Sequence, residues 1–520
     1  GTYVKATTET DLQVGDKSND ATRVSADDLH VKVVGEGANL GVTQAGRIQF
    51  AQRGGRINSD AIDNSAGVDS SDHEVNIKIL LKAAIDAGEF EADQRNDLLA
   101  SMTDEVAEKV LVHNYDQTGA LSVAEASAAA DLDSHERMME RLEARGILNR
   151  SVEGLPKSEE IRGLHEAKSG LTRPEIAVLL AYAKLTLFDE LVAGTVPDDP
   201  FLEEMYKSYF PAPLRRFDNA LTSHRLKREI IATQLANDII NLGGPTFVHR
   251  VKERAGVATD AIARAFIASK EIFSLSPLLK KIDELDNQVP ADIQIGLRLD
   301  LINALRRQVF WLARTRSIAE NISEIVDHYQ PHVARLIQSG KDTLSPYETD
   351  VLEEREARYR DDGAPDSIAH NVAMILSMTS ATDIVDLADR TRQDVLPAAC
   401  LFSAVGSVFG FDRLRQTALT LKLDQHWDRL AVRGLVETLL VQQNNLSEQI
   451  SANHESLELN DFSAAQKVVE KFVEENAESY ERLELLLADL EQSGAWTFAK
   501  LVLFANGMRS FIDETDLGAR

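Results

Sequence analysis

Two short stretches near the N-terminal end of the sequence carry polar side chains of the kind that bind small ligands. The first, GEGAN, ends at Asn39, and the second, DNSAGVDSSDHEV (63–75), contains Asn64 and Ser71. A carboxamide offers both a donor and an acceptor, which suits the amide or hydroxyl groups of a ligand. A serine hydroxyl at the start of a helix can donate to an anion that the free backbone N–H groups also attract. These residue types therefore predict a site for a polar, anionic molecule.

The second stretch also has a purely structural interpretation. Ser71 followed by Glu74 fits the capping box Ser-x-x-Glu, in which each side chain satisfies the backbone N–H of the other residue. On this interpretation a helix runs on from Asp72 and places Val75 and Ile79 on one apolar stripe, while NSAG is only a tight turn. The two interpretations compete for one hydroxyl, and both stay open at this point.

The segments around these stretches alternate between strand-like and helix-like patterns. The β-branched run LHVKVV (29–34) is typical of a buried parallel strand, TQAGRIQFAQRGG (43–55) predicts a helix closed by glycine, and RIN (56–58) predicts a second short strand. This order is typical of a doubly wound α/β sheet, in which ligands bind beyond the carboxyl ends of the strands. We therefore predict a partial doubly wound, Rossmann-like α/β segment, with Asn39 and Asn64 facing one crevice.

The rest of the sequence has the pattern of helices. A helix that begins near Leu171 shows Thr172 as its cap, Pro174 in its first turn and Glu175 three residues after the cap. Its apolar residues lie almost all round, so we expect it to be central and buried. The fold class predicted for the whole chain is mixed, with the α/β segment followed by a large all-α region.

Domain boundaries follow from this change of pattern. We place the α/β segment at residues 1–92 and one or more helical domains at 93–520, with the acidic stretch 353–366 as a candidate linker or exposed loop. The chain begins at Gly1 without an initiator methionine, which suggests either processing or a piece of a longer protein.

Composition narrows the classes of partner. The 520 residues are 43% hydrophobic and 27% charged, a balance typical of globular proteins. The net charge of −28 repels nucleic acid and anionic lipid. No apolar run approaches the roughly 20 residues of a membrane span. Cys400 is the only cysteine, so no intramolecular disulfide forms, and its apolar neighbours predict a core thiol. We expect a cytoplasmic protein with no nucleic-acid or membrane partner.

Other candidate sites have stronger structural explanations. His328 and His332 have the i, i+4 spacing of metal ligands, but Pro331 between them argues against the helix that they would need, so we assign no metal site. The histidine-containing segment 135–146 has the charge pattern of a solvated helix.

Aromatic and basic residues elsewhere also favour structural roles. The arginines of LRRQVFWLARTR (305–316) could bind an anionic effector, but an amphipathic helix explains them better. Trp427 and Trp496 are interpreted as core residues.

Taken together, the two polar stretches resemble the C-terminal end of the coenzyme domain of glutamate dehydrogenases. That family carries Gly-Ala-Asn and then Asn-Ala-Gly-Gly-Val-x-x-Ser-x-x-Glu at about this spacing. The sequence is most similar to the large, NAD-specific class, whose subunits are much longer. The segments that carry this similarity are GDKSNDATRV, VKVVGEGANLGVTQAGR and GGRINSDAIDNSAGVDSSDHEVNIKILL. The matching residues are Gly37, Ala38 and Asn39 in the first motif and Asn64, Gly67, Val68, Ser71 and Glu74 in the second.

The resemblance implies oxidative deamination of L-glutamate to 2-oxoglutarate and ammonia, with hydride transfer to NAD. It implies that Gly37, Ala38, Asn39 and Asn64 bind the cofactor. It further implies that Val68 lines the side chain of the substrate and that Ser71 binds the γ-carboxylate of glutamate. These implications rest on the family and not on spacing or composition.

Parts of that family's machinery are missing from this sequence. There is no Gly-x-Gly-x-x-Gly/Ala fingerprint and no stretch that resembles the catalytic lysine motif, so no catalytic residue is assigned here. We therefore expect the C-terminal portion of a larger, oligomeric enzyme, inactive alone and completed by the rest of its own subunit. The alternative is a stand-alone helical interaction or regulatory protein that retains a relic of an enzyme domain.

Overall fold

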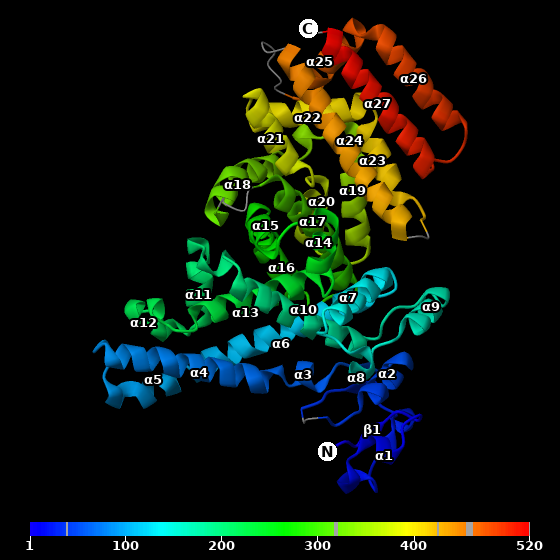
Figure 1. Ribbon diagram of the computed structural model, residues 1–520. Coiled ribbons are helices and arrows are strands. Elements are labelled where there is room, and N and C mark those ends of the chain that lie inside the picture. Colours follow the sequence, from blue (N-terminus) through cyan, green and yellow to red (C-terminus); the bar gives the residue numbers. More distant parts are fainter. Residues whose placement is uncertain (38–39, 317–320, 424–425, 454–460, 519–520) are drawn as a thin grey trace. The chain divides into compact units, whose positions relative to one another are not determined.

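The computed structural model describes residues 1–37, 40–316, 321–423, 426–453 and 461–518 (Figure 1). These residues form two compact units. The first contains residues 1–267 and 305–323, and the second contains residues 268–304 and 324–520. The boundary predicted between residues 92 and 93 falls inside the first unit.

The first unit holds all of the described strands and most of the shorter helices. Its strands are β1 (Val4–Lys5), β2 (Val24–Ser25), β3 (Val33–Val34) and β4 (Arg56–Ile57). Its α-helices are α1 (Asp11–Val14), α2 (Gln44–Gln52), α3 (Asp60–Asp63), α4 (Ser65–Asp86), α5 (Arg95–Ser101), α6 (Thr103–Ala126), α7 (Leu132–Ala144), α8 (Arg150–Glu153), α9 (Ser158–Glu166), α10 (Arg173–Ala193), α11 (Glu203–Tyr209), α12 (Asp218–Thr222), α13 (Lys227–Gly243) and α14 (Phe247–Ala255).

The second unit is helical throughout its described residues. Residues of α15 (Thr259–Ile272), α17 (Ala291–Thr315) and α18 (Ile322–Ser339) belong to both units. The other helices of the second unit are α16 (Leu275–Asp283), α19 (Pro346–Asp361), α20 (Asp366–Ser377), α21 (Ala381–Thr391), α22 (Val395–Val408), α23 (Phe411–Thr420), α24 (His426–Asn453), α25 (Phe462–Glu475), α26 (Ala477–Gln492) and α27 (Phe498–Gly518).

The prediction of a partial doubly wound, Rossmann-like α/β segment is wrong, because the chain is nearly all helical. The described strands are two residues long and form two separate parallel pairs, β1 with β2 and β3 with β4. The run 29–34 misled the prediction because its β-branched residues are not buried. Val33 in β3 is 66% exposed and Val31 is exposed as well. Such a segment has too few ladder hydrogen bonds and too little buried surface to form a layered sheet.

Local signals predicted several elements correctly. Helix α2 follows Thr43, whose side chain accepts from the backbone N–H of Gly46, and Gly54 with φ +86° follows its end. Helix α10 has the predicted capping box, in which Glu175 accepts from the backbone N–H of Thr172 at 2.7 Å. It is largely buried and packs against α13, α6 and α2, as Figure 1 shows.

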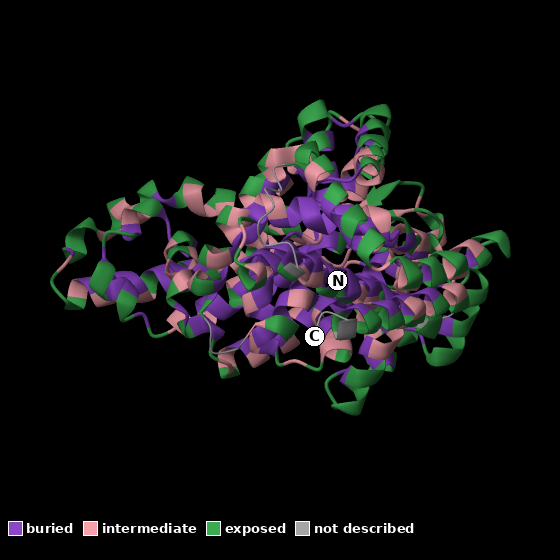
Figure 2. Ribbon diagram, turned by 90° about the horizontal axis from the view of Figure 1, so that it is seen from above, coloured by how far each residue is buried: buried purple, intermediate pink, exposed green. Residues whose placement is uncertain are grey.

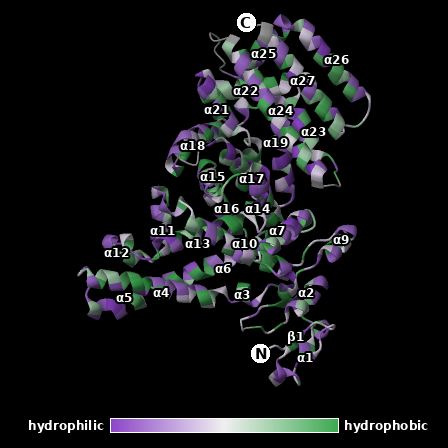
Figure 3. Cartoon of the chain, viewed as in Figure 1, coloured by the Kyte–Doolittle hydropathy of each residue, from purple (hydrophilic) through white to green (hydrophobic). Residues whose placement is uncertain are grey.

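Side chains in both units segregate by hydropathy. Buried and exposed residues alternate along the helices (Figure 2), and so do hydrophobic and hydrophilic residues (Figure 3). Cys400 lies in the apolar core of α22, as predicted, and burial raises its pKa to about 11. Trp496 packs against the same core, but Trp427 is 72% exposed, so its predicted core role is wrong.

Two further expectations fail in the second unit. Most of the stretch 353–366 lies in α19 and therefore forms a helix instead of a loop. Pro331 was expected to interrupt a helix, but helix α18 continues through it.

Within the described parts of the chain, no single helix is long and apolar enough to cross a membrane. Two bent pairs, α20 with α21 and α22 with α23, pass together by length and composition alone, and α22 lies in the core of the second unit.

Candidate functional site

The two polar stretches lie next to each other in the first unit. The backbone N–H of Glu36 donates to Oδ2 of Asp63 at 2.9 Å, and the backbone N–H of Leu40 donates to Oδ2 of Asp60 at 3.2 Å. Both acceptors belong to α3, whose last residue, Asp63, is the first residue of the DNSAGVDSSDHEV stretch. The loop after β3 is therefore tied to the turn that starts α4.

The predicted cofactor residues sit on either side of these bonds. Gly37 lies in the loop, and a Cβ atom there would meet no heavy atom within 4 Å, so its backbone is open to a ligand. Ala38 and Asn39 lie outside the described residues. The half-buried Asn64 precedes α4, and its carboxamide has no hydrogen-bond partner among the described residues. Its Oδ1 lies 3.0 Å from where a Cβ of Gly67 would stand, so this glycine lets the carboxamide lie against the helix.

A buried ion pair holds the base of the loop. The guanidinium of Arg47 in α2 donates from Nε to Oε2 of Glu36 at 2.5 Å and from Nη2 to Oε1 at 2.9 Å. The same carboxylate accepts from the backbone N–H of Val42 at 3.1 Å, and Arg47 reaches Asp60 at 3.3 Å. Because both charged groups are buried, their bidentate geometry is needed to offset desolvation. Glu36 at the start of the loop and Val42 at its end are therefore both held next to Arg47 of α2.

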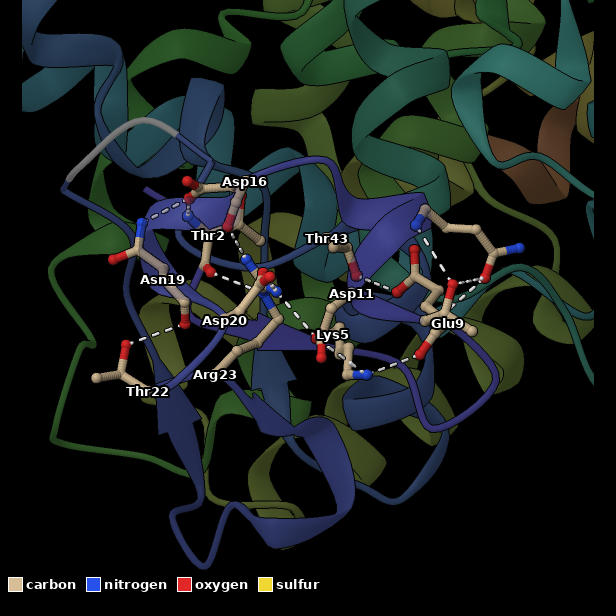
Figure 4. A network of polar contacts seen from close by, with 12 residues as sticks. Thr2, Lys5, Glu9, Asp11, Asp16, Asn19, Asp20, Thr22, Arg23 and Thr43 are labelled. Atoms are coloured by element: carbon tan, nitrogen blue, oxygen red, sulfur yellow. Dashed lines mark hydrogen bonds and ion pairs between the residues drawn. The ribbon is translucent and has the colours of Figure 1, made fainter.

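A second polar network holds the segment before β2 (Figure 4). The enclosed guanidinium of Arg23 donates to the carbonyl oxygen of Thr2 at 3.0 Å, to that of Asp16 at 2.6 Å, and to the carboxylates of Asp11 and Asp20 at 2.9 and 2.7 Å. The hydrogen bond from Arg23, together with one from Lys5, lowers the pKa of the Asp11 carboxyl. Arg23, Asp16 and Asp20 belong to the GDKSNDATRV stretch quoted above, so that stretch has a structural role in this unit.

Helix α6 fixes the junction between α3 and α4. The side chain of Asn114 donates to the carbonyl oxygen of Ile62 and to Oγ of Ser65, both at 2.8 Å. On the other side, Asn58 donates to Oδ1 of Asp63 at 2.6 Å and accepts from the first residue of α10, Arg173. These bonds set the direction in which α4 leaves the turn.

The capping interpretation of Ser71 is wrong. Helix α4 begins at Ser65 with Asn64 at its N-cap, so Ser71 lies two turns inside the helix. Its hydroxyl donates to the carbonyl oxygen of Gly67 at 3.2 Å, an ordinary back-bond within a helix. The Ser-x-x-Glu pattern is present in the sequence, but the hydrogen bonds from Asn114 in α6 hold a helix that starts seven residues earlier.

One exposed stripe of α4 carries the predicted ligand-binding residues. Asn64, Val68, Ser71 and Val75 follow the i, i+4, i+7, i+11 spacing of a single helix face. Val68 is 76% exposed and Val75 is 52% exposed, so the predicted apolar stripe through Val75 and Ile79 is not the buried face of the helix. The buried residues of α4 are instead His73, Asn76, Ile77, Leu80, Leu81 and Ala84. The structure therefore presents Val68 and Ser71 on one accessible surface with Asn64 at its start.

The buried side of the same helix carries titratable residues that the sequence analysis did not single out. His73 is fully buried and stacks on Tyr209 with ring centroids 4.3 Å apart. Burial lowers the pKa of His73 to about 4, although the nearby carboxylate of Asp69 opposes this shift. Burial also raises the pKa of Asp72, against a hydrogen bond from Tyr209. Asp69, Asp72 and His73 have the i, i+3, i+4 spacing of neighbours on one helix, and this spacing was the only sign of the cluster in the sequence. The rings that contact His73, those of Tyr209 and His113, come from distant segments.

Sequence comparisons identify the family. A model described as glutamate dehydrogenase, C-terminal, matches residues 168–510. The chain belongs to this glutamate dehydrogenase family. A second model, described as bacterial NAD-glutamate dehydrogenase, catalytic domain, matches residues 1–124, so the motif-bearing loop and α4 of this glutamate dehydrogenase chain lie in the catalytic-domain match.

Relatives named NAD-specific glutamate dehydrogenase agree with this assignment. The chain is 41% identical to one from Pseudomonas aeruginosa over 451 residues, which cover 86% of this chain and 28% of the relative. It is 36% identical to one from Mycobacterium tuberculosis over 510 residues, or 98% of this chain and 31% of the relative. The glutamate dehydrogenase chain described here therefore spans less than a third of the length of these relatives.

The remaining candidates of this glutamate dehydrogenase chain have structural partners. In α17, Arg306 donates to the carbonyl oxygen of Gly243 at 2.9 Å, and Arg314 lies 5.2 Å from the ring centroid of Phe310. The helix predicted to be solvated is α7, in which His135 is buried, so that prediction is wrong. His328 lies 3.1 Å from the carboxylate of Asp389.

Proposed function

We propose that this chain is part of an NAD-dependent glutamate dehydrogenase that deaminates L-glutamate oxidatively to 2-oxoglutarate and ammonia. Family membership supports the reaction class. The observation that carries the assignment of this region is the exposed stripe of α4, where the motif residues Val68 and Ser71 share one accessible face. The chain supplies one wall of the site, and the rest of its own subunit supplies the catalytic lysine and the dinucleotide fingerprint. The full enzyme is a homo-oligomer.

The residues present fit a nicotinamide cofactor and a dicarboxylate substrate. NAD, when bound, accepts the hydride that leaves Cα of glutamate. The unpartnered carboxamide of Asn64 can both donate to and accept from the nicotinamide amide. The open backbone at Gly37 lets a ligand approach the loop closely. Ala38 and Asn39 complete the predicted cofactor set, as the family motif implies.

The substrate residues act through one exposed surface. Val68 offers aliphatic surface to the methylene groups of glutamate, and the hydroxyl of Ser71 turns from its back-bond to donate to the γ-carboxylate. The back-bond to Gly67 is long enough, at 3.2 Å, that exchanging it for a charged acceptor is favourable. Exposure of the apolar side chains of Val68 and Val75 to water is unfavourable. This favours a surface from elsewhere in the subunit that covers them.

The test is to replace Ser71 in the full-length protein and measure glutamate-dependent reduction of NAD. Ser71→Ala should raise the KM for glutamate by about 10- to 100-fold, because a hydrogen bond to a charged group contributes roughly 1.5–3 kcal/mol. The KM for NAD should stay unchanged, whereas Asn64→Ala should raise it. Since Ser71 is exposed, the variant should fold normally.

The adjacent Ser70 provides a matched control. It is also an exposed serine on α4, but it lies outside the family motif, so Ser70→Ala should leave both KM values unchanged. Equal kinetics for the two variants would contradict the role of Ser71. An intact protein of about the mass of this chain with no glutamate-dependent activity would favour the alternative, a helical interaction or regulatory protein.

A further inference from the structure

Three potential metal ligands meet between α4 and α6, away from the exposed stripe. Nδ1 of His113 lies 2.8 Å from Oδ2 of Asp69, and Nε2 of His73 lies 3.8 Å from Oδ1 of the same carboxylate. One ligand atom from each residue lies within 4.8 Å of the other two. Asp69 and His73 are one turn apart on α4, while His113 comes from α6, 44 residues from Asp69. The helix pair therefore brings together two imidazoles and one carboxylate.

The burial and bonding of His73 are a second, independent observation that points to a ligand. Its side chain is fully buried, and neither ring nitrogen has a hydrogen-bond partner among the described residues. Leaving a buried polar atom unsatisfied costs about 1–3 kcal/mol. Asn76 and Asp72 are near neighbours, but both are bonded to the hydroxyl of Tyr209 instead. Stacking on Tyr209 holds the His73 ring in place without using either nitrogen.

We propose that Asp69, His73 and His113 bind a divalent first-row transition ion, with Zn²⁺ as the best-fitting ion. Two imidazoles and one carboxylate are a donor set that proteins use for this class of ion. Neither the family comparisons nor the proposed deamination assigns such a site. The site does not depend on the proposed function, since its ligands face α6 and not the stripe that carries Ser71.

Binding of the ion requires the His113 imidazole to rotate, because the rings of His73 and His113 lie 15° from parallel with their centroids 5.9 Å apart. Ligand atoms 2.0–2.1 Å from a tetrahedral Zn²⁺ lie about 3.4 Å from one another. The two contacts with Asp69, 2.8 Å from His113 to Oδ2 and 3.8 Å from His73 to Oδ1, bracket this value, although they involve different oxygens of the carboxylate. The imidazole of His113 is about half exposed, so its rotation can adjust the geometry, and solvent can fill the fourth position. The site would then be a cross-link between α4 and α6 that stays open to water.

Charges around the site are balanced. The carboxylate of Asp72 faces it from α4, and the ammonium of Lys109 faces it from α6. Lys109 is held away by its hydrogen bond to the carbonyl oxygen of Ser208 at 2.8 Å and by Glu105 at 3.9 Å. The carboxylate of Asp69 therefore meets the ion before the lysine does.

The experiment is to strip the full-length protein with EDTA and titrate it with Zn²⁺ by isothermal calorimetry. The wild type should bind one equivalent that Asp69→Asn and His113→Ala each weaken at least tenfold. Co²⁺ added in its place should give the visible spectrum of a tetrahedral site, which these variants lose. His73→Phe keeps a ring that can stack on Tyr209 but has no nitrogen ligand, so this variant should also lose the bound equivalent of Zn²⁺. Unfolding temperatures of the metal-free variants show that they are folded.

A matched control separates this site from casual binding by surface histidines. His165 and Asp133 form another histidine–carboxylate pair at 3.1 Å, and no third potential ligand joins them among the residues that the structure describes. His165→Ala should therefore keep the Zn²⁺ equivalent. The proposal is overturned if the wild type binds no Zn²⁺ at micromolar concentration, or if all three cluster variants keep the equivalent. Glutamate-dependent NAD reduction is measured separately, so failure of the metal site and failure of the proposed function are distinguishable.

Discussion

The N-terminal segment and the C-terminal helices of this chain are held together in different ways. Residues 1–57 share a small apolar cluster and depend on polar networks around Arg23 and Arg47. Helices α22–α27 instead surround a large apolar core that includes Phe472, Phe504 and Phe511. Hydrogen bonds and ion pairs are directional, whereas apolar burial is not.

This difference corresponds to what each region must do. The loop that we propose as part of the cofactor site needs its backbone at a defined place, and the pair of Arg47 with Glu36 provides it. A helical core has no such demand and gains its stability from area and packing. The comparison predicts that core truncation in the C-terminal helices and loss of a single charge in the N-terminal segment both have large effects, each confined to its own region.

The largest effect is expected from truncation in the apolar core. Phe504→Ala should lower the free energy of unfolding of α22–α27 by about 3–5 kcal/mol, because the side chain is fully buried and leaves a cavity. Hydrogen exchange measured by mass spectrometry should rise in these helices and stay unchanged in residues 1–57. Its neighbour Leu503 is half exposed, so Leu503→Ala is the matched control and should cost under about 0.5 kcal/mol.

A slightly smaller effect is expected from breaking the buried ion pair. Arg47→Ala should destabilise the N-terminal segment by about 3 kcal/mol, because it leaves the carboxylate of Glu36 buried without its partner. Hydrogen exchange around residues 33–57 should rise first. Arg53→Ala removes an exposed pair with Asp27 and should cost at most about 1 kcal/mol.

The double variant Glu36→Leu/Arg47→Met sharpens this test. If the penalty comes from an uncompensated charge, replacing both partners with apolar side chains should restore most of the lost stability. The loop would still be less well placed, because Glu36 also accepts from the backbone N–H of Val42. A double variant as unstable as Arg47→Ala would contradict the electrostatic explanation.

The sequence predicted elements whose signals are local. Thr172 and Glu175 cap α10 with their own side chains, and Gly54 follows α2, so neighbouring residues sufficed. The neighbourhood of the two polar stretches was predicted from a doubly wound sheet that the structure does not have, so the reason given for it was wrong. The stretches are nevertheless in contact, through the hydrogen bond from the backbone N–H of Glu36 to Asp63.

What could not be predicted depends on distant contacts. The start of α4 is set by Asn114, about fifty residues away, so the nearby Ser-x-x-Glu pattern pointed to the wrong residue. The strand run containing Val33 had the right residue types, but no layer covers it. His73 and His113 come together only when α4 packs on α6. No spacing rule in one sequence contains that information.

The last prediction concerns a polar residue inside an apolar interior of the first unit. Burial lowers the pKa of His135 to about 4, with Arg250 and Arg306 adding to the shift and Asp131 opposing it. Between this value and the ordinary value of 6.5 the unfolded chain binds more protons than the folded one, so stability falls as the pH falls. At pH 5 the loss should be about 2 kcal/mol relative to pH 7.

Replacing this histidine isolates its contribution to the pH dependence. His135→Gln cannot take up a proton, so urea unfolding of the variant at pH 7 and at pH 5 should show a smaller difference than the wild type does, by about 2 kcal/mol. The variant will be less stable than the wild type at pH 7, because the imidazole is buried and well packed. The informative quantity is therefore the change between the two pH values within each protein. If acidification costs both proteins the same free energy, His135 is not the buried neutral group that its surroundings indicate.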